Sequence, residues 1–205
     1  MNNLLFYVII YLVGDIMQRY YYHGFDNYDY EGGIEHIIEI IKSGGLKNRN
    51  DVKDLGDNNY NHVCLYRKNE EYDYASDEHL LRSARGGWID GCMVFIISPE
   101  IEAYKVRYSE SGIGFDEEGP YSNLVDEYRS VGDIPNSKIV GIALPLNGIG
   151  KYLDDNIGEE RKTRLRTLFS QLMALMQEYK FQLKNSEEEN FTDKLDEELN
   201  IQMTK

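Results

Sequence analysis

Three short pieces of the sequence carry side chains that could do chemistry together. The pieces are Tyr22-His23-Gly24, Cys64-Leu65-Tyr66-Arg67 and Asp126-Glu127-Tyr128. An imidazole can hold a hydroxyl group, a tyrosine ring can stack on a flat ligand, a guanidinium can pair with phosphate, and a carboxylate can stabilise a positive charge. Each piece also has an ordinary interpretation: a satisfied structural histidine, an alternating strand and a solvated acidic pair. The order of the pieces along the chain and the segments around them must therefore decide between a chemical and a structural role.

The segments around these pieces predict the elements that must position them. Residues 19–23 are β-prone and end at Gly24, which predicts a short strand followed by a turn. In residues 33–43, isoleucines spaced i, i+3, i+4 and i+7 predict a helix that Gly44-Gly45 ends. The β-prone run at residues 62–66 predicts a second strand.

Further elements follow in the second half of the chain. A helix is expected to open at Ser76-Asp77-Glu78, where Ser76 or Asp77 can cap it, and the apolar run 92–97 predicts a central strand covered on both faces. Residues 109–122, rich in Gly, Ser, Asp and Glu, predict a long loop of the kind that is often functional. A buried strand is expected at residues 139–144. An amphipathic helix is expected at residues 159–183 with its apolar stripe as a core face, and the last twenty residues as a solvated or frayed tail.

The first and last of these regions resemble the ADP-ribosyltransferase superfamily, which includes poly-ADP-ribose polymerases and bacterial toxins. Tyr21-Tyr22-His23-Gly24 and Ile41-Lys42-Ser43-Gly44-Gly45-Leu46 are similar to the family's opening strand ending in His-Gly and its helix ending near Gly-Leu. The run 126–142, with Ile134-Pro135 and then Ile139-Val140-Gly141-Ile142, looks like the segment that carries the family's glutamate. The resemblance covers roughly residues 20–145. It implies an α+β fold with a small split β-sheet core and flanking helices, followed here by a long C-terminal helix.

The resemblance, of the His-Tyr-Glu type, implies a mono-ADP-ribosyltransferase that uses NAD as its substrate and releases nicotinamide. The implied catalytic residues are Glu127, His23 and Tyr66, and the implied NAD-binding residues are Tyr22, Gly24 and Arg67. Glu127 would stabilise an oxocarbenium-like ribose and orient the sugar through a hydroxyl group. His23 would hold the adenosine ribose, and Gly24 would let the dinucleotide approach the backbone. Tyr66 would stack on the nicotinamide ring, and Arg67 would pair with the pyrophosphate.

Two details of the resemblance remain to be assigned. The first is the tyrosine of the His-Tyr-Glu type, the middle residue of the three. Its candidates are Tyr66, preferred for its place in the strand order, Tyr60 and Tyr104. Arginine-modifying members carry a second acidic residue two positions before the catalytic glutamate, where this chain has Val125. Asp126 should not replace it, because neighbouring residues of a strand point to opposite faces. A protein acceptor modified elsewhere than at arginine is therefore expected, with a nucleic acid as the alternative acceptor.

The expected organisation has three parts. An apolar N-terminal segment at residues 1–18 precedes an ADP-ribosyltransferase-like domain at 19–150, and a C-terminal amphipathic helix with an acidic tail occupies 151–205. The apolar run 4–13 is too short to cross a bilayer and lacks the pattern of a signal peptide, while Met17 offers an alternative start. A cytoplasmic protein is expected, or a toxin or effector delivered into a cytosol, without membrane contact. An antitoxin or another protein partner is expected to use the C-terminal helix.

Composition supports a competing function. The chain has 36 acidic and 22 basic residues, so its net charge of −14 repels a phosphate backbone on average and suits a basic protein partner. Cys64 and Cys92 have no CxxC or Cys/His spacing, and the four histidines show no HExxH pattern, so neither a disulfide framework nor a metal site is expected. The alternative is a non-enzymatic acidic module that masks a basic partner through the 159–183 helix or the acid cluster at 187–198.

Overall fold

A seven-stranded sheet runs through the centre of the computed structural model, which describes residues 19–24, 29–47, 63–69, 76–85, 93–105, 125–155 and 157–203. Its strands are β1 (Tyr21–Gly24), β3 (Cys64–Lys68), β4 (Val94–Ile97), β5 (Ala103–Lys105), β6 (Val125–Ser130), β8 (Ile139–Leu144) and β9 (Gln182–Asn185). Their order across the sheet is β5-β6-β3-β1-β4-β8-β9. Neighbours pair antiparallel except β8 and β9, which are parallel. β2 (Gly45–Leu46) and β7 (Ile134–Pro135) pair separately.

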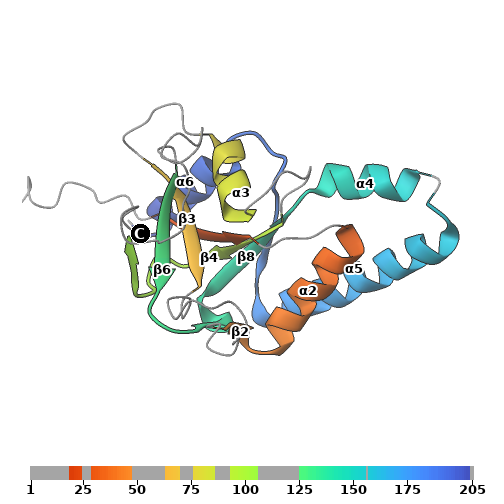
Figure 1. The fold of residues 1–205 in the computed structure, drawn as a ribbon, viewed down its shortest axis with the longest axis horizontal. Helices are drawn as coiled ribbons and strands as arrows, with labels where there is room; N and C mark the ends of the chain where they lie inside the picture. Colours follow the sequence, from red (N-terminus) through yellow and green to blue (C-terminus); the bar gives the residue numbers. More distant parts are fainter. Residues whose placement is uncertain are drawn as a thin grey trace, which may run out of the picture.

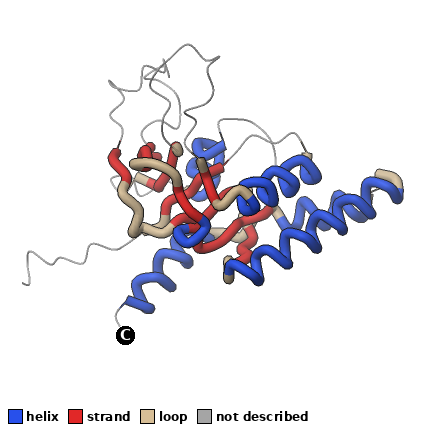
Figure 2. The backbone as a smooth tube through the Cα atoms, turned by 90° about the horizontal axis from the view of Figure 1, so that it is seen from below, coloured by secondary structure: helices blue, strands red, loops and turns tan. Residues whose placement is uncertain are grey.

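Helices cover both faces of the sheet. They are α2 (Tyr30–Lys42), α3 (Asp77–Arg85), α4 (Leu146–Asp154), α5 (Glu159–Tyr179) and α6 (Phe191–Met203), with the short 3-10 helix η2 (Asn136–Lys138) before β8. Figures 1 and 2 show α2, α4 and α5 together at one end of the molecule, while α3 and α6 lie beside the strands. The mixed α+β class predicted from the sequence is confirmed.

The larger core lies between the sheet and the α2–α5 pair. Ile34, Ile37 and Ile41 of α2 are fully buried in it, as the isoleucine spacing predicts. Leu165 and Leu172 of α5 are fully buried in the same core. The apolar stripe of α5 is therefore a core face, as the sequence predicts.

The smaller core lies on the opposite face, under α3 and α6. Tyr22 of β1, Val94 of β4 and Leu80 of α3 are buried there, and Phe191 and Leu195 of α6 join them. The alternation of each strand separates the two cores, because successive side chains point to opposite faces.

The start of α2 and the turn after it differ slightly from the expected bounds. The helix begins three residues before the predicted start because Asp29 caps it, its carboxylate accepting from the Gly32 N–H at 2.7 Å. After the helix, Gly45 has a φ of 125°, and a Cβ there would lie 2.2 Å from the carbonyl oxygen of Ile134. Only glycine therefore fits where β2 meets β7.

The predicted helix over 159–183 is too long. α5 ends at Tyr179 because Lys180 adopts the left-handed conformation, with φ 60° and ψ 33°. The chain then turns, Phe181 is buried, and residues 182–185 form β9, which extends the main sheet beside β8. The spacing of Leu183 continues the apolar stripe in sequence, but this leucine belongs to a strand.

The prediction of a solvated or frayed tail is wrong for residues 187–203. α6 packs on the sheet, with Phe191, Leu195 and Asp196 at most 5% exposed. Glu187 accepts from the backbone N–H groups of Asn147 and Gly148 and so caps α4, a helix that the sequence did not predict. The C-terminal segment is thus part of the same folded unit as the central sheet.

Several predictions fall outside the described residues: the apolar run 4–13, Met17, Tyr60, Cys92 and the loop 109–122. Across the described part of the chain, no helix combines the length and apolar character that a membrane crossing requires. Within that same part, no three His, Cys, Asp or Glu side chains gather as a metal ion would need.

Candidate functional site

The strand register brings three of the predicted site residues into one row. Tyr22 of β1 lies directly opposite Tyr66 of β3, and Tyr66 lies directly opposite Glu127 of β6. Residues that pair across neighbouring strands share a face of the sheet. The row Tyr22–Tyr66–Glu127 therefore faces the α3–α6 side, where Tyr22 is buried and Tyr66 packs against the smaller core.

Glu127 is a partly buried carboxylate with an unused acceptor. Its side chain is 22% exposed, and its Oε1 atom is buried without a hydrogen-bond partner. Arg129 Nε lies 3.7 Å from Oε1, within ion-pair range but too far for a hydrogen bond. Burial raises the pKa of Glu127, while the neighbouring Arg129 guanidinium and, to a lesser degree, the Cys64 side chain act in the opposite direction and only partly offset it.

His23 lies on the other face of the sheet. It follows Tyr22 in β1 and pairs with Phe95, which is buried in the larger core. Its Nδ1 is 2.7 Å from the backbone carbonyl oxygen of Cys64, and because a carbonyl only accepts, Nδ1 carries the proton. Strand alternation thus does not bring His23 and Glu127 to one face, although both contact Cys64.

Arg67 also points away from the row. Its Nε donates to the Tyr20 carbonyl at 3.2 Å, its Nη2 donates to the Arg19 carbonyl, and its guanidinium lies 3.4 Å from the centre of the Tyr21 ring. These contacts tie β3 to the start of β1. A pyrophosphate on Arg67 would have to displace them. Gly24 is buried at the end of β1 opposite Val94.

The strand register shows which candidate tyrosine lies nearest to Glu127 and which residues of β6 share its face. Tyr66 faces Glu127 directly, whereas Tyr104 on the edge strand β5 faces Arg129 and is 43% exposed. Val125 is buried on the Glu127 face of β6. Asp126 points to the opposite face, as alternation predicts, and pairs with Lys105 at 2.7 Å.

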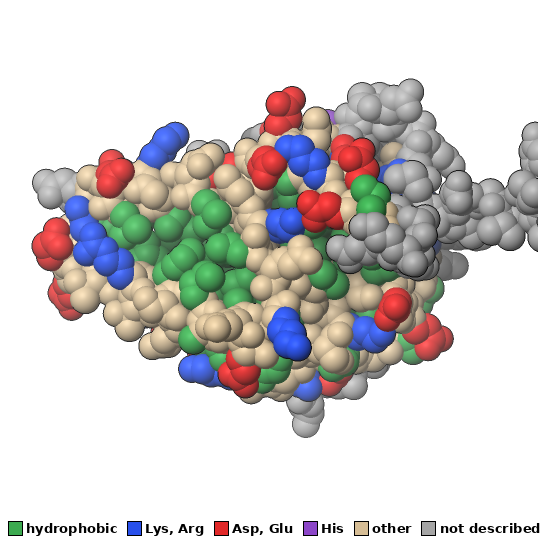
Figure 3. All heavy atoms as spheres, turned by 180° about the vertical axis from the view of Figure 1, so that it is seen from behind, with side chains coloured by type: hydrophobic (Ala, Val, Ile, Leu, Met, Phe, Trp, Pro, Cys, Tyr) green, Lys and Arg blue, Asp and Glu red, His purple; other side chains and the backbone are tan. Residues whose placement is uncertain are grey.

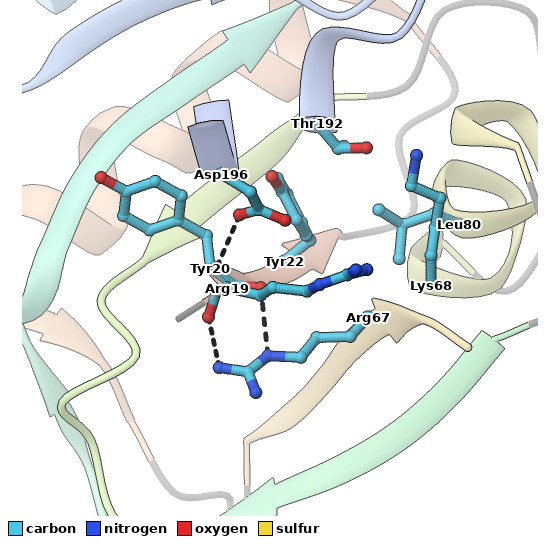
Figure 4. Close-up of a pocket in the computed structure, with 8 residues that line it drawn as sticks. All are labelled: Arg19, Tyr20, Tyr22, Arg67, Lys68, Leu80, Thr192 and Asp196. Atoms are coloured by element: carbon cyan, nitrogen blue, oxygen red, sulfur yellow. Dashed lines mark hydrogen bonds between the residues drawn. The ribbon is translucent and has the colours of Figure 1, made fainter. Parts of the chain in front are cut away.

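A small pocket lies at the Tyr22 end of the row, between the sheet, α3 and α6 (Figure 4). Its lining residues are Arg19, Tyr20, Tyr22, Arg67, Lys68, Leu80, Thr192 and Asp196. The Tyr22 hydroxyl is buried there without a hydrogen-bond partner, and the Phe191 ring packs edge-on against the Tyr22 ring at 6.0 Å. Helix α6 therefore closes this end of the row.

A hydrogen bond of Asp196 and ion pairs of Lys68 hold α6 over the pocket. Asp196 accepts from the Tyr20 N–H at 3.0 Å, and burial raises the pKa of Asp196 to about 6. Lys68 Nζ lies 3.1 Å from Asp77 of α3 and 2.5 Å from Asp193 of α6. These contacts could not be predicted from the sequence, because the acid cluster at 187–198 has the composition of a solvated segment. The spacing of Phe191, Leu195 and Leu199 was the signal that could have identified α6.

No protein-family model matches the chain, and neither a curated protein nor a solved structure matches it. The chemistry of the row is therefore inferred from contacts within the chain.

Proposed function

We propose that the chain is an NAD-dependent mono-ADP-ribosyltransferase whose reacting ribose binds at Glu127. One observation carries the proposal: Glu127 Oε1 is buried without a hydrogen-bond partner and stands directly across from an aromatic side chain, Tyr66. Leaving a buried acceptor unsatisfied costs about 1–3 kcal/mol. A ribose hydroxyl would supply the missing donor.

The proposed chemistry needs an ionised carboxylate beside a developing positive charge. The bond between the nicotinamide nitrogen and the ribose C1 breaks, and its electron pair leaves with nicotinamide. The acceptor's nucleophilic atom then bonds to C1 and loses a proton. Glu127 would stabilise the oxocarbenium-like ribose between these events, and the Tyr66 ring would stack on the nicotinamide. Both residues belong to paired strands, which hold a site more rigidly than loops do.

The predicted site residues would have different roles, according to the face of the sheet on which each one lies. Glu127, Tyr66 and Tyr22 share a face and form its centre. His23 acts from the other face through the Cys64 carbonyl, and Arg67 supports β1. The His-Gly resemblance therefore supports the proposal less than the segment around Glu127 does. The acceptor is a protein in our proposal, and the setting is a toxin or effector that acts in a cytosol.

Nicotinamide release from NAD tests the proposal. The full chain is incubated with NAD and with water, a protein mixture or nucleic acid as acceptor. Glu127→Gln keeps the shape of the side chain and removes its charge, so we expect a loss of about 10²- to 10³-fold. Asp126→Asn is the matched control because Asp126 is the adjacent carboxylate and lies on the opposite face. Absence of NAD turnover by the wild type with every acceptor would refute the proposal.

His23→Ala refines the same experiment. Because His23 lies on the opposite face of the sheet and hydrogen-bonds the Cys64 backbone, we expect a smaller loss of nicotinamide release than for Glu127→Gln. A loss equal to that of Glu127→Gln, together with weaker NAD binding, would show that His23 contacts the dinucleotide and would overturn this weighting.

One observation favours a second function, a protein-binding module. Figure 3 shows hydrophobic side chains gathered on the back face, at the end of the molecule that carries α4 and α5, and an exposed apolar area of this kind commonly marks an interface. The acid cluster suits that role less well, because Glu187 caps α4, Glu188 pairs with Lys194 and Asp196 is buried. Partner binding that survives in Glu127→Gln, without NAD turnover by the wild type, would favour the module.

A further inference from the structure

Two side chains support Glu127 from its own face of the sheet. Arg129 follows it by two positions in β6, and Cys64 lies directly across from Arg129 in β3. Tyr66 completes the arrangement opposite Glu127. Glu127, Arg129, Cys64 and Tyr66 therefore occupy the corners of one rectangle on two paired strands, so their side chains are neighbours by register.

Arg129 is placed where a charge has little water to stabilise it. The residue is 9% exposed, and its Nε lies 3.7 Å from Glu127 Oε1. A buried charge without a partner is strongly unfavourable, and this applies equally to the guanidinium and the carboxylate. The Arg129 charge therefore favours the ionised form of Glu127. Because the two atoms do not reach hydrogen-bond distance, the pairing leaves Oε1 without a donor.

Cys64 adjoins the carboxylate from the second strand. Its side chain is a neighbour of Glu127 by register and favours the ionised form of that carboxyl. Its backbone carbonyl accepts from His23 Nδ1 at 2.7 Å on the other side of the sheet, so the imidazole helps to fix the backbone of Cys64. This chain of contacts links His23 to Glu127 although the two side chains lie on opposite faces.

We propose that Arg129 and Cys64 are positioning residues that hold the Glu127 carboxylate charged and in one orientation, with Oε1 left for a substrate hydroxyl. The catalytic consequence rests on the proposed function, but the support of the carboxylate does not. An uncharged Glu127 could not stabilise an oxocarbenium-like ribose, so loss of Arg129 disables the site at pH values where the wild type works.

The groups that face Glu127 define what else could change its titration. Arg129 faces it from β6, Cys64 and Tyr66 face it from β3, and Tyr104 stands on the same face of β5. Lys68 of β3 is also on this face, but its Nζ pairs with Asp77 and Asp193. Helix α3, which packs on β6, begins with Asp77-Glu78-His79. Arg129 is the cation in this set that adjoins the carboxylate, so its removal should have the largest effect.

Carboxyl titration by NMR in the full chain tests the support directly. In Arg129→Gln the midpoint of Glu127 should rise by about one pH unit or more, which lowers the ionised fraction about tenfold below the midpoint. Arg129→Lys should stay near the wild type, and Cys64→Ala should shift the midpoint upward by less than Arg129→Gln. Lys105→Gln is the matched control, because Lys105 neighbours β6 but pairs with Asp126 on the opposite face.

Nicotinamide release across pH separates this proposal from the proposed function. Arg129→Gln should lose about tenfold in kcat at pH values below the Glu127 midpoint and regain it at higher pH, a recovery that a purely structural defect would not show. Shifted Glu127 midpoints without NAD turnover by the wild type would overturn the proposed function. They would leave intact the proposal that Arg129 and Cys64 hold the carboxylate. A Glu127 midpoint unchanged in Arg129→Gln would overturn the support. If Arg129→Gln fails to fold, an unchanged midpoint in Cys64→Ala would overturn it as well.

Discussion

The two faces of the sheet differ in the kind of groups that they bury. The face under α2 and α5 buries a nearly continuous set of aliphatic side chains. The face under α3 and α6 has a smaller apolar core, and it also buries the Tyr22 hydroxyl and Glu127 Oε1 without hydrogen-bond partners. Native proteins satisfy most buried polar atoms, so exceptions call for an explanation. The α2–α5 face has the larger apolar core, although Asn136 Oδ1 beside the end of α2 also lacks a partner. We place the chemistry on the α3–α6 face because the unsatisfied atoms of Tyr22 and Glu127 belong to one row there.

The buried carboxylates of the two faces also differ in how they are paired. On the α2 side the buried Glu31 is fully engaged, accepting from Arg161 Nε at 3.0 Å and Nη2 at 3.1 Å. This bidentate pair joins α2 to α5 and leaves neither carboxylate oxygen unused. On the other face, Glu127 and Asp196 both have raised pKa values because burial outweighs their partners. Buried acids with raised pKa values are characteristic of functional sites.

The largest effect on stability is expected from Ile37→Ala. Ile37 is fully buried between α2 and the sheet, so truncation removes apolar contacts and leaves a cavity that costs about 2–5 kcal/mol. Urea unfolding measures this loss, while nicotinamide release per folded molecule should be unchanged. Ile40→Ala is the control, because Ile40 has the same side chain on the same helix and is only partly buried. Equal losses in the two variants would contradict the difference between the faces.

A somewhat smaller loss is expected at the turn after α2. Gly45→Ala combines a φ of 125° with a Cβ 2.2 Å from a backbone oxygen, which should cost about 2–3 kcal/mol. Gly44→Ala has a φ of 92° but nothing within 4 Å, so it should cost about 1 kcal/mol. Thermal unfolding of both variants separates backbone strain from the steric contact. If Gly44→Ala is as damaging as Gly45→Ala, the close approach to β7 does not matter.

Asp196 should make stability depend on pH in a definite direction. Its pKa rises from 3.8 to about 6 in the folded chain, so the folded state binds more protons than the unfolded state between these values. Stability should therefore fall by about 2 kcal/mol as pH rises from about 4 to 6, and then stay level. Asp196→Asn keeps an acceptor for the Tyr20 N–H and should remove most of this slope.

Urea unfolding from pH 4 to 7.5 measures that slope in the wild type and in Asp196→Asn. Because burial also raises the pKa of Glu127, Glu127→Gln serves as the comparison that removes the second contribution. A slope of opposite sign, or one that Asp196→Asn leaves intact, would show that α6 does not bury this carboxyl.

The elements that could be predicted from the sequence are those that local pattern determines. The bounds of β8 match the predicted strand at 139–144, and the isoleucine spacing identifies the buried face of α2. The end of α5 could not be predicted, because no Gly or Pro marks it and Lys180 takes the left-handed conformation in its tertiary setting. Helix α6 was missed because its charged residues outweighed the apolar spacing, and Asp196 is buried by a contact with Tyr20, 176 residues away in sequence.

In the candidate site, too, the residue types could be predicted from the sequence, but their arrangement could not. The residue types of Glu127 and Tyr66 were visible in the sequence, but their direct pairing depends on the β3–β6 register, which the sequence does not contain. The position of His23 depends on register as well. Since Tyr22 shares a face with Glu127, its neighbour His23 must point the other way. A motif that names both residues therefore does not determine whether they meet.

The smallest effect is expected from Tyr22→Phe, and its sign is informative. The Tyr22 ring is 2% exposed and its hydroxyl has no partner, so removing that oxygen should stabilise the chain by about 1 kcal/mol or less. Tyr66→Phe is the matched control in the same row, because Tyr66 is only partly buried. A loss of stability in Tyr22→Phe would mean that the hydroxyl is satisfied in solution.

Nicotinamide release gives the second measurement on Tyr22→Phe. The pocket beside this hydroxyl is closed by Phe191 and Asp196 of α6, so a ligand can use the oxygen only if α6 moves. A gain in stability with lower turnover would show that the unsatisfied hydroxyl is kept for NAD and that α6 opens during the reaction. A gain in stability with unchanged turnover would confine the site to Glu127 and Tyr66, and α6 would then be a fixed part of the smaller core.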